Sequence, residues 1–363
     1  MLDAKIFQIT DLHFGNKIVK ADVMFKNYTS FLNDNRTTIA SSDIFLLTGD
    51  IPDSLLYSNG EAYNYMIKFM LHVASICVKY NIIMIYLEGT PLHEMAQMKV
   101  VSSIITDAYP ELEYRYHNEL ALHTLEKYDM TYITIPDQIT KDDETLFLGV
   151  RKLLRANNLS KVDFMFTHTS YEEAIKYADD KTKSTKVWSN MVSKFILNGH
   201  IHQYSFHNKV ITCGALDFIC HGDTETKGGM FIKVINNSAV PKFIVNKHVT
   251  TFLTIETDDA ITVAQKHINR LNLGGKVYHL RILGYVDASI SSKLKMDNPL
   301  LRLTILKPKT DIEVREEGEL TNIEITSFDI TPENVISLIE EELAMKDELL
   351  VKELQVIMKE VQQ

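Results

Sequence analysis

The chain has 363 residues, of which 45% are hydrophobic and 24% charged, and this globular composition excludes wholesale disorder. Its length favours two domains, or one large domain with an appendage. The net charge is −10, with 48 acidic residues against 38 lysines and arginines, which excludes a generic basic nucleic-acid-binding protein. A polyanion would have to be bound with the help of metal ions, a local basic patch or a partner protein.

The cysteines and the apolar segments indicate a cytoplasmic protein. There are only three cysteines, without the spacing of a metal site, so we expect a reducing compartment and no disulfide framework. The first ten residues do not have the pattern of a signal peptide. No run of 18 or more apolar residues occurs, and we therefore expect no membrane-spanning helix.

The first part of the chain alternates short apolar strands with helices. Strands are predicted at residues 5–10, 43–48 and 82–87, and a helix at residues 61–80 precedes the third of them. This order implies a parallel or mixed sheet covered on both faces. In such sheets the ligand site lies at the carboxyl ends of the strands.

The next part is richer in β-structure, and the character of the chain changes again after it. Residues 249–328 predict a small α/β domain, and residues 329–363 a helix that begins at Thr331-Pro332. We therefore expect three parts, with residues 1–248 as the first. Within it, β-structure is predicted at 114–135, a helix at 144–157, and further strands at 162–167, 195–197, 210–213 and 229–235.

Histidine and aspartate follow the strand ends. In an Asp-x-His or His-x-His sequence that continues a strand, both side chains point to the same side. Carboxylate and imidazole ligands suit Mn²⁺, Zn²⁺ or Fe²⁺, and one carboxylate can bridge two ions that together clamp a phosphate. The residues concerned are Asp11 and His13, Asp50, His93 beyond the third strand, His168, and the pair His200 and His202.

In this order, the motifs resemble those of the calcineurin-like metallophosphoesterase superfamily: D-x-H, G-D-x-x-D, G-N-H-D/E, H and G-H-x-H. The resemblance covers residues 1–235. Within the superfamily, the D-L-H-F-G of Asp11–Gly15 and the segments 211–218 and 225–234 are similar to those of SbcD-type nucleases. These are the nuclease subunits of DNA double-strand-break repair complexes, and some are encoded by phages.

The resemblance implies an α/β fold, with a β-sandwich of two mixed sheets flanked by helices. It also implies a small α/β cap domain that recognises DNA, and a C-terminal helix that docks onto an SMC-like coiled-coil ATPase. A homodimer is expected, with Ile67, Met70 and Leu71 on the helix at 61–80 as candidate contacts. For a phage-encoded member, the location would be the cytoplasm of the host cell.

Two divalent metal ions are implied by the same resemblance, and Mn²⁺ is the expected metal. Asp50 would bridge the two ions. The first ion would also be bound by Asp11, His13 and His202, and the second by His168 and His200.

Three further residues take roles from the resemblance. His93 would stabilise the transition state or protonate the leaving 3′ oxygen. Glu94 would orient His93, as carboxylates orient imidazoles in other metal sites. Asp53 would support the site rather than bind metal directly.

One motif departs from the family pattern. Where the family has Gly-Asn-His, this chain has Gly89-Thr90-Pro91-Leu92-His93, so the asparagine ligand of the second metal is missing. Thr90 or Glu88 could supply the oxygen instead. Alternatively, the second metal binds weakly and only with substrate, or the activity is impaired.

Several lysines are candidate DNA contacts, because lysine binds phosphates irrespective of sequence. An equally good interpretation of the Lys-rich segment 171–187 is a solvated loop. The candidates are Lys17 and Lys20 beyond the first motif, and Lys181, Lys183 and Lys186.

These observations favour a Mn²⁺-dependent DNA exonuclease and endonuclease that processes DNA ends in recombination and repair with its ATPase partner. Two alternatives remain open at this point. One is another phosphodiesterase or phosphatase of the superfamily. The other is a catalytically impaired subunit that recruits the ATPase.

Overall fold

The structure is a computed structural model that describes residues 2–137, 142–174, 182–223, 225–256, 260–284 and 286–306. The chain up to Leu306 forms one compact unit. The predicted final helix, residues 329–363, lies outside the described residues, and the domain boundaries at 248 and 328 remain predictions. No helix in the described part of the chain is long and apolar enough to cross a membrane.

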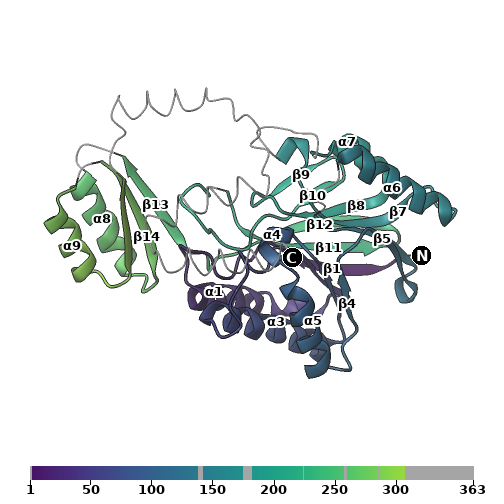
Figure 1. The fold of residues 1–363 in the computed structure, drawn as a ribbon, viewed down its shortest axis with the longest axis horizontal. Helices are drawn as coiled ribbons and strands as arrows, with labels where there is room; N and C mark the ends of the chain where they lie inside the picture. Colours follow the sequence, from purple (N-terminus) through teal and green to yellow (C-terminus); the bar gives the residue numbers. More distant parts are fainter. Residues whose placement is uncertain are drawn as a thin grey trace, which may run out of the picture. The chain divides into compact units, whose positions relative to one another are not determined.

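Two six-stranded mixed sheets form the centre of the fold (Figure 1). In the first sheet the neighbouring strands β1, β2, β3 and β4 run parallel, and the two remaining strands form an antiparallel edge. In spatial order the strands are β12 (Ser238–Val245), β11 (Gly228–Ile235), β1 (Ala4–Ile9), β2 (Ile44–Thr48), β3 (Ile83–Leu87) and β4 (Tyr114–His117).

The second sheet also has parallel strands at its centre, but it has antiparallel strands at both edges. Its strands, in spatial order, are β5 (Ala121–Leu125), β6 (Met130–Ile135), β7 (Val162–His168), β8 (Val192–Gly199), β10 (Val210–Thr212) and β9 (Ser205–His207).

Successive side chains of a strand point to opposite faces of its sheet. One hydrophobic core therefore forms between the two sheets, and others form under the helices. Along β1, Ile6 packs between the sheets, whereas Phe7 packs under the helices of the outer face. Both faces of each sheet are covered, and this explains why the strands have apolar residues at nearly every position. The helices are α1 (Ala21–Asp34), α2 (Arg36–Ala40), α3 (Glu61–Tyr80), α4 (Pro91–Glu94), α5 (Gln97–Ala108), α6 (Asp143–Ala156) and α7 (Thr185–Trp188), with 3₁₀ turns at Glu126–Tyr128, Glu172–Ala174 and Ser189–Met191.

Helices α1, α3 and α5 pack on the first sheet and α6 packs on the second (Figure 1). The prediction of an α/β fold with two mixed sheets flanked by helices is therefore confirmed. Met70, a candidate dimer contact, is fully buried in the core beneath α3, so that prediction is wrong for this residue. Ile67 and Leu71 are partly buried against the same core.

A third, smaller sheet follows the two large ones. Its three parallel strands, with two helices, surround a core of their own. The elements are β13 (Thr251–Glu256), α8 (Ala260–Asn272), β14 (Tyr278–Leu283), α9 (Ala288–Asp297) and β15 (Leu301–Leu306). The separate core favours the predicted small α/β domain, although α9 was not expected from the sequence.

A buried carboxylate, Asp217, ties the start of this third sheet to α1. Its oxygens accept hydrogen bonds from Asn27 Nδ2 (2.7 Å), from the backbone nitrogen of Phe218 (2.7 Å), and from the backbone nitrogen (2.6 Å) and hydroxyl (3.0 Å) of Thr250. Burial nevertheless raises the pKa of Asp217 from 3.8 to about 6. An acid whose pKa is raised by folding stabilises the protein at low pH, and loses this contribution as the pH rises through about 4 to 6.

Replacing Asp217 by alanine is therefore expected to destabilise the protein by an amount that depends on pH. The loss of the acceptor for several buried donors costs about 2–4 kcal/mol. Because the wild-type carboxyl is mostly protonated at pH 5 and ionised at pH 7.5, the cost should be about 1 kcal/mol smaller at pH 7.5. Urea unfolding of both proteins at the two pH values measures this difference, and an equal or larger cost at pH 7.5 would contradict the expectation.

Candidate metal centre

The site lies where the carboxyl ends of central strands from both large sheets meet. A direct link between the sheets is the hydrogen bond from His168 Nδ1, at the end of β7, to the carbonyl oxygen of Thr48 in β2 (2.6 Å). This bond places a proton on Nδ1, so that in the neutral imidazole it is Nε2 that would offer a lone pair to a metal ion.

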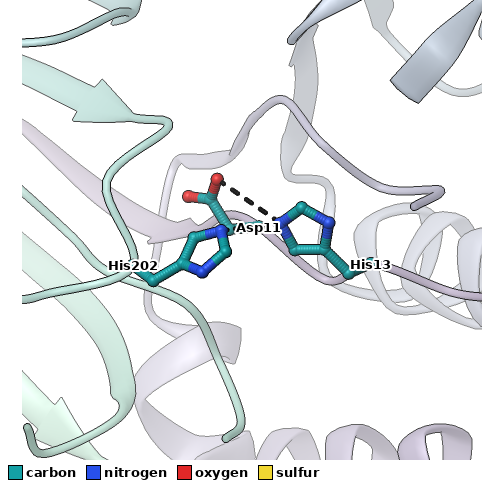
Figure 2. Close-up of side chains that lie close together, drawn as sticks. All are labelled: Asp11, His13 and His202. Carbon is teal, nitrogen blue, oxygen red and sulfur yellow. Dashed lines mark hydrogen bonds and ion pairs between the residues drawn. The ribbon is translucent and has the colours of Figure 1, made fainter. Parts of the chain in front are cut away.

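Asp11, His13 and His202 form the first group of donors, and Figure 2 shows their side chains facing one another. Asp11 and His13 come from the loop after β1, and His202 from the loop after β8. The Nε2 atoms of His13 and His202 lie 2.9 Å apart, and His13 Nε2 lies 4.0 Å from Asp11 Oδ1. Neighbouring nitrogen ligands on one ion at about 2.1 Å would have a similar separation.

Asp50 contributes to the two other groups, one with His13 and His93 and one with His168 and His200. Its Oδ2 atom lies 2.9 Å from His93 Nδ1 and 3.2 Å from His168 Nε2. The potential ligand atoms of each group lie within 4.8 Å of one another. All six predicted metal ligands are thus brought together, and their carboxylate and imidazole donors suit a divalent transition metal ion.

Thr90, one of the residues predicted to supply an oxygen to the second metal, lies against Asp50 and two imidazoles of the site. Its hydroxyl lies 3.1 Å from Asp50 Oδ2, 3.3 Å from His168 Nε2 and 3.4 Å from His200 Nδ1. Its backbone nitrogen donates to Asp50 Oδ1 (2.6 Å), which fixes the carboxylate. A neutral oxygen is therefore present among the donors of the Asp50–His168–His200 group.

Replacing Thr90 by valine, which has the same shape but no hydroxyl, is expected to weaken the binding of one Mn²⁺ equivalent by about 10-fold or more. The Asp11 group should keep its affinity, and serine at position 90 should behave like the wild type because it retains the hydroxyl. Isothermal titration of the metal-free protein with Mn²⁺ resolves the equivalents. Unchanged affinity for every equivalent in the valine variant would rule out Thr90 as a ligand.

The backbone at four of the six predicted ligands adopts the left-handed conformation, with φ of 52° at Asp11, 51° at His13, 52° at Asp50 and 83° at His200. Such angles are uncommon outside glycine and cluster at functional sites. They turn the chain sharply as each strand ends. All four residues belong to the donor groups of the site.

Close approach of the two sheets explains the glycine before Asp50. Gly49 has a φ of +91°, and a Cβ there would lie 2.5 Å from His168 Nδ1 and from the Cα of Gly89. A side chain at this position would therefore push β7 away from β2. The Gly-Asp sequence is thus required by packing as well as by chemistry.

The charges of the site are strongly coupled. Burial alone would raise the pKa of Asp50, but His168, His93 and His13 hold it well below its usual range. Burial opposes the charging of His168, yet Asp50 raises the pKa of this imidazole to about 10. Burial lowers the pKa of His200 and His202, which favours the neutral form that binds metal.

His93 lies beside these donors, and the structure corrects the role expected for its neighbour. The hydrogen bond to Asp50 raises the pKa of His93. Glu94 is buried and bonds to the Tyr86 hydroxyl and the Ile51 backbone nitrogen (3.4 Å). The carboxylate that contacts the His93 ring is therefore that of Asp50, and Glu94 instead anchors the short helix α4.

Asp53 and Glu88 lie at the edge of the site. Asp53 Oδ1 lies 3.2 Å from His13 Nδ1, on the side of the ring opposite to the metal-facing nitrogen, which suits the supporting role expected for it. Although burial opposes it, His13 lowers the pKa of Asp53. Burial raises the pKa of Glu88, and its side chain bonds to Tyr116 rather than to the donor groups described above.

The lysines predicted to contact DNA differ in their solvent exposure. Lys17, Lys20 and Lys186 are exposed, and Lys181 lies outside the described residues. Lys183 is only 2% exposed, because its Nζ atom donates to Thr169 Oγ1 (2.8 Å) and lies over the Trp188 ring. The prediction that Lys183 contacts DNA is therefore wrong.

A cavity of about 530 Å³ adds basic residues that the sequence did not single out. It lies between Lys17 and the third sheet, and its lining includes His279, Lys295 and Arg302. No motif or spacing marked these three residues, since strands β14 and β15 and helix α9 bring them together only in the folded chain.

Comparison with known proteins gives limited information. No family model matches the chain, and no curated protein matches it. Among solved structures, it is similar to TT1561 of Thermus thermophilus, with 10% identity over 66% of this chain and 99% of that chain, at a TM-score of 0.37. It is also similar to GAP50, the anchor in the inner membrane complex of Plasmodium, with 12% identity over 68% of this chain and 86% of that chain, at a TM-score of 0.37. Similarities at this level assign no function to the chain.

Proposed function

We propose that this chain is a metal-dependent phosphodiesterase of the calcineurin-like metallophosphoesterase type. The observation that carries the proposal is the sharing of Asp50 between two overlapping donor groups, next to a third group around Asp11. One carboxylate between two sets of imidazoles is the arrangement required to hold two divalent ions, Mn²⁺ being the expected metal.

Each residue has a distinct part in the proposed reaction. Divalent ions held by these groups would supply Lewis-acid activation of the phosphodiester and of the attacking water. Asp11, His13 and His202 would hold one ion and His168 and His200 the other, with Asp50 between them and Thr90 as a neutral oxygen donor. His93, whose ring Asp50 orients through Nδ1, would give a proton to the leaving oxygen.

The substrate we propose is DNA, with end processing in recombination and repair as the role. The D-L-H-F-G motif, the third sheet after the main fold and exposed Lys17 and Lys20 support this choice over other phosphodiesters. An SMC-like ATPase bound through the C-terminal helix, and a homodimer, complete the proposal.

The test is hydrolysis by the purified chain with Mn²⁺, using end-labelled single-stranded and duplex DNA beside bis-p-nitrophenyl phosphate. Cleavage of DNA that is lost on chelation supports the proposal. Hydrolysis of the generic ester without DNA cleavage would leave a phosphodiesterase with a different substrate. The absence of any metal-dependent hydrolysis would refute the enzyme assignment.

A further inference from the structure

A fully buried asparagine, Asn198, lies near the end of β8, two residues before the ligand His200. Its side-chain oxygen accepts hydrogen bonds from the hydroxyl of Thr167 (2.7 Å) and from the backbone nitrogen of Thr169 (3.2 Å). Its side-chain nitrogen donates to the carbonyl oxygen of Thr169 (2.9 Å) and to the hydroxyl of Thr212 (3.3 Å). Both lone pairs and both protons of the amide are therefore used within the protein, and none is left for a metal ion.

Three of these four bonds hold the residues on either side of His168. Thr167 precedes this histidine in β7, and Thr169 follows it directly. Strands β7 and β8 are parallel neighbours in the second sheet (Figure 1). A single side chain of β8 thus fixes the chain of β7 before and after one ligand, while the backbone of β8 continues to the next ligand, His200.

The two strand ends approach each other closely at this point. A Cβ on Gly199 would lie 2.8 Å from His168 Nδ1 and 2.2 Å from the carbonyl oxygen of Thr48, which accepts the hydrogen bond from that same nitrogen. The ring centroids of His168 and His200 are 5.2 Å apart, and both imidazoles share a donor group with Asp50. A shift of β7 along β8 would therefore move one imidazole of this group relative to the other.

The choice of an amide for this buried position is informative. Asparagine is depleted in strands, and burying its side chain costs free energy unless every polar atom finds a partner. An apolar side chain of similar size could fill the space, but its contacts have no preferred direction. A fully bonded buried amide instead holds its neighbours in one arrangement. This favours a role for Asn198 in fixing the position of β7 relative to β8, beyond the filling of space.

We propose that Asn198 is a positioning residue for the second metal ion, because its amide holds His168 and His200 at the separation that a shared ion requires. This inference rests on the proposed function. Residues that orient metal ligands in this way typically contribute about 10- to 100-fold to metal affinity. The affinity of the Asp50–His168–His200 group should therefore depend on Asn198, whereas that of the Asp11 group should not.

The experiment titrates the metal-free full chain with Mn²⁺ by calorimetry and compares the wild type with Asn198→Leu, which removes the amide at similar side-chain size. The matched control is Asn27→Leu. Asn27 is also a buried asparagine, but its amide donates to Asp217 and Thr250, which lie outside the donor groups. Electron paramagnetic resonance of the Mn²⁺-loaded proteins shows whether two ions lie close enough to be magnetically coupled.

A milder pair of variants covers the case in which Asn198→Leu does not fold. Thr167→Val keeps the shape of the side chain and removes only the hydroxyl that donates to Asn198. Thr134→Val is its control, since Thr134 is also buried in the second sheet but its hydroxyl donates to the carbonyl oxygen of Glu119 (3.0 Å).

Asn198→Leu is expected to weaken the binding of one Mn²⁺ equivalent by about 10- to 100-fold and to leave the other unchanged. Thr167→Val should weaken the same equivalent by a smaller factor. The signal of coupled ions should be present in the wild type and in both controls, and isolated Mn²⁺ should replace it in Asn198→Leu. Asn27→Leu should unfold at a lower urea concentration than the wild type and still bind both equivalents.

Two results would overturn the inference and leave the proposed function intact. One is unchanged affinity for both equivalents in Asn198→Leu or, if that variant does not fold, in Thr167→Val. The other is the same loss of affinity in the matched control, because the effect would then follow from reduced stability rather than from position. If the wild type neither binds Mn²⁺ nor hydrolyses a phosphodiester, the proposed function fails and this inference with it.

Discussion

Replacing Asp50 by asparagine is expected to lower metal-dependent phosphodiester hydrolysis by more than about 1000-fold. Asp50 contacts His93 and His168 and belongs to two donor groups, so its charge serves the whole site. Asparagine has nearly the same shape but is neutral and offers only one oxygen. It can neither bridge two ions nor balance the charge that His168 acquires beside the native carboxylate.

The matched control for this variant is Asp53→Asn. Asp53 is also an aspartate next to an imidazole of the site, but it faces His13 Nδ1 and lies outside the donor groups. Its replacement should cost about 10- to 100-fold, as for other residues that orient a ligand. Steady-state rates with Mn²⁺ and the number of Mn²⁺ equivalents bound measure both variants. Hydrolysis by Asp50→Asn within tenfold of the wild type would refute the proposed metal centre.

The sequence was sufficient for those parts of the fold in which local and tertiary preferences agree. The helix predicted at residues 61–80 has these bounds in the structure, and the apolar strands are buried on both faces as expected. Strand β12 was missed because it is an edge strand, half exposed and interrupted by Pro241. Its signal was the Asn236-Asn237 turn, where both residues have positive φ.

The candidate site was predictable to the level of residue type but not of contact. The positions of the strand ends in the sequence indicated which side chains come together, because the carboxyl ends of parallel strands lie on the same side of the sheet. The sequence could not show that Asp50, rather than Glu94, contacts His93, since that depends on how α4 packs against Tyr86. Nor could composition show that Lys183 turns inward, because its partners lie on other elements.

Replacing His93 by alanine is expected to lower kcat by about 100- to 10,000-fold while the binding of Mn²⁺ changes little. His93 shares one potential donor group with His13 and Asp50, but the Asp11 group and the Asp50–His168–His200 group, which are proposed to hold the ions, keep all their ligands without it. The loss should therefore fall on the chemical step. This outcome differs from that of Asp50→Asn, in which metal binding and hydrolysis are lost together.

The pH profile tests whether His93 acts as a general acid. Because the hydrogen bond to Asp50 raises the pKa of His93, the imidazole stays protonated to a higher pH than a free imidazole does, and kcat should fall as the pH rises through that raised pKa. The residual activity of His93→Ala should lack this fall, whereas His207→Ala, which replaces an exposed histidine of β9, should keep it. A fall of the same size in His93→Ala would assign the titration to another group. His93 would then stabilise the transition state without transferring a proton, which would still require the large loss of kcat.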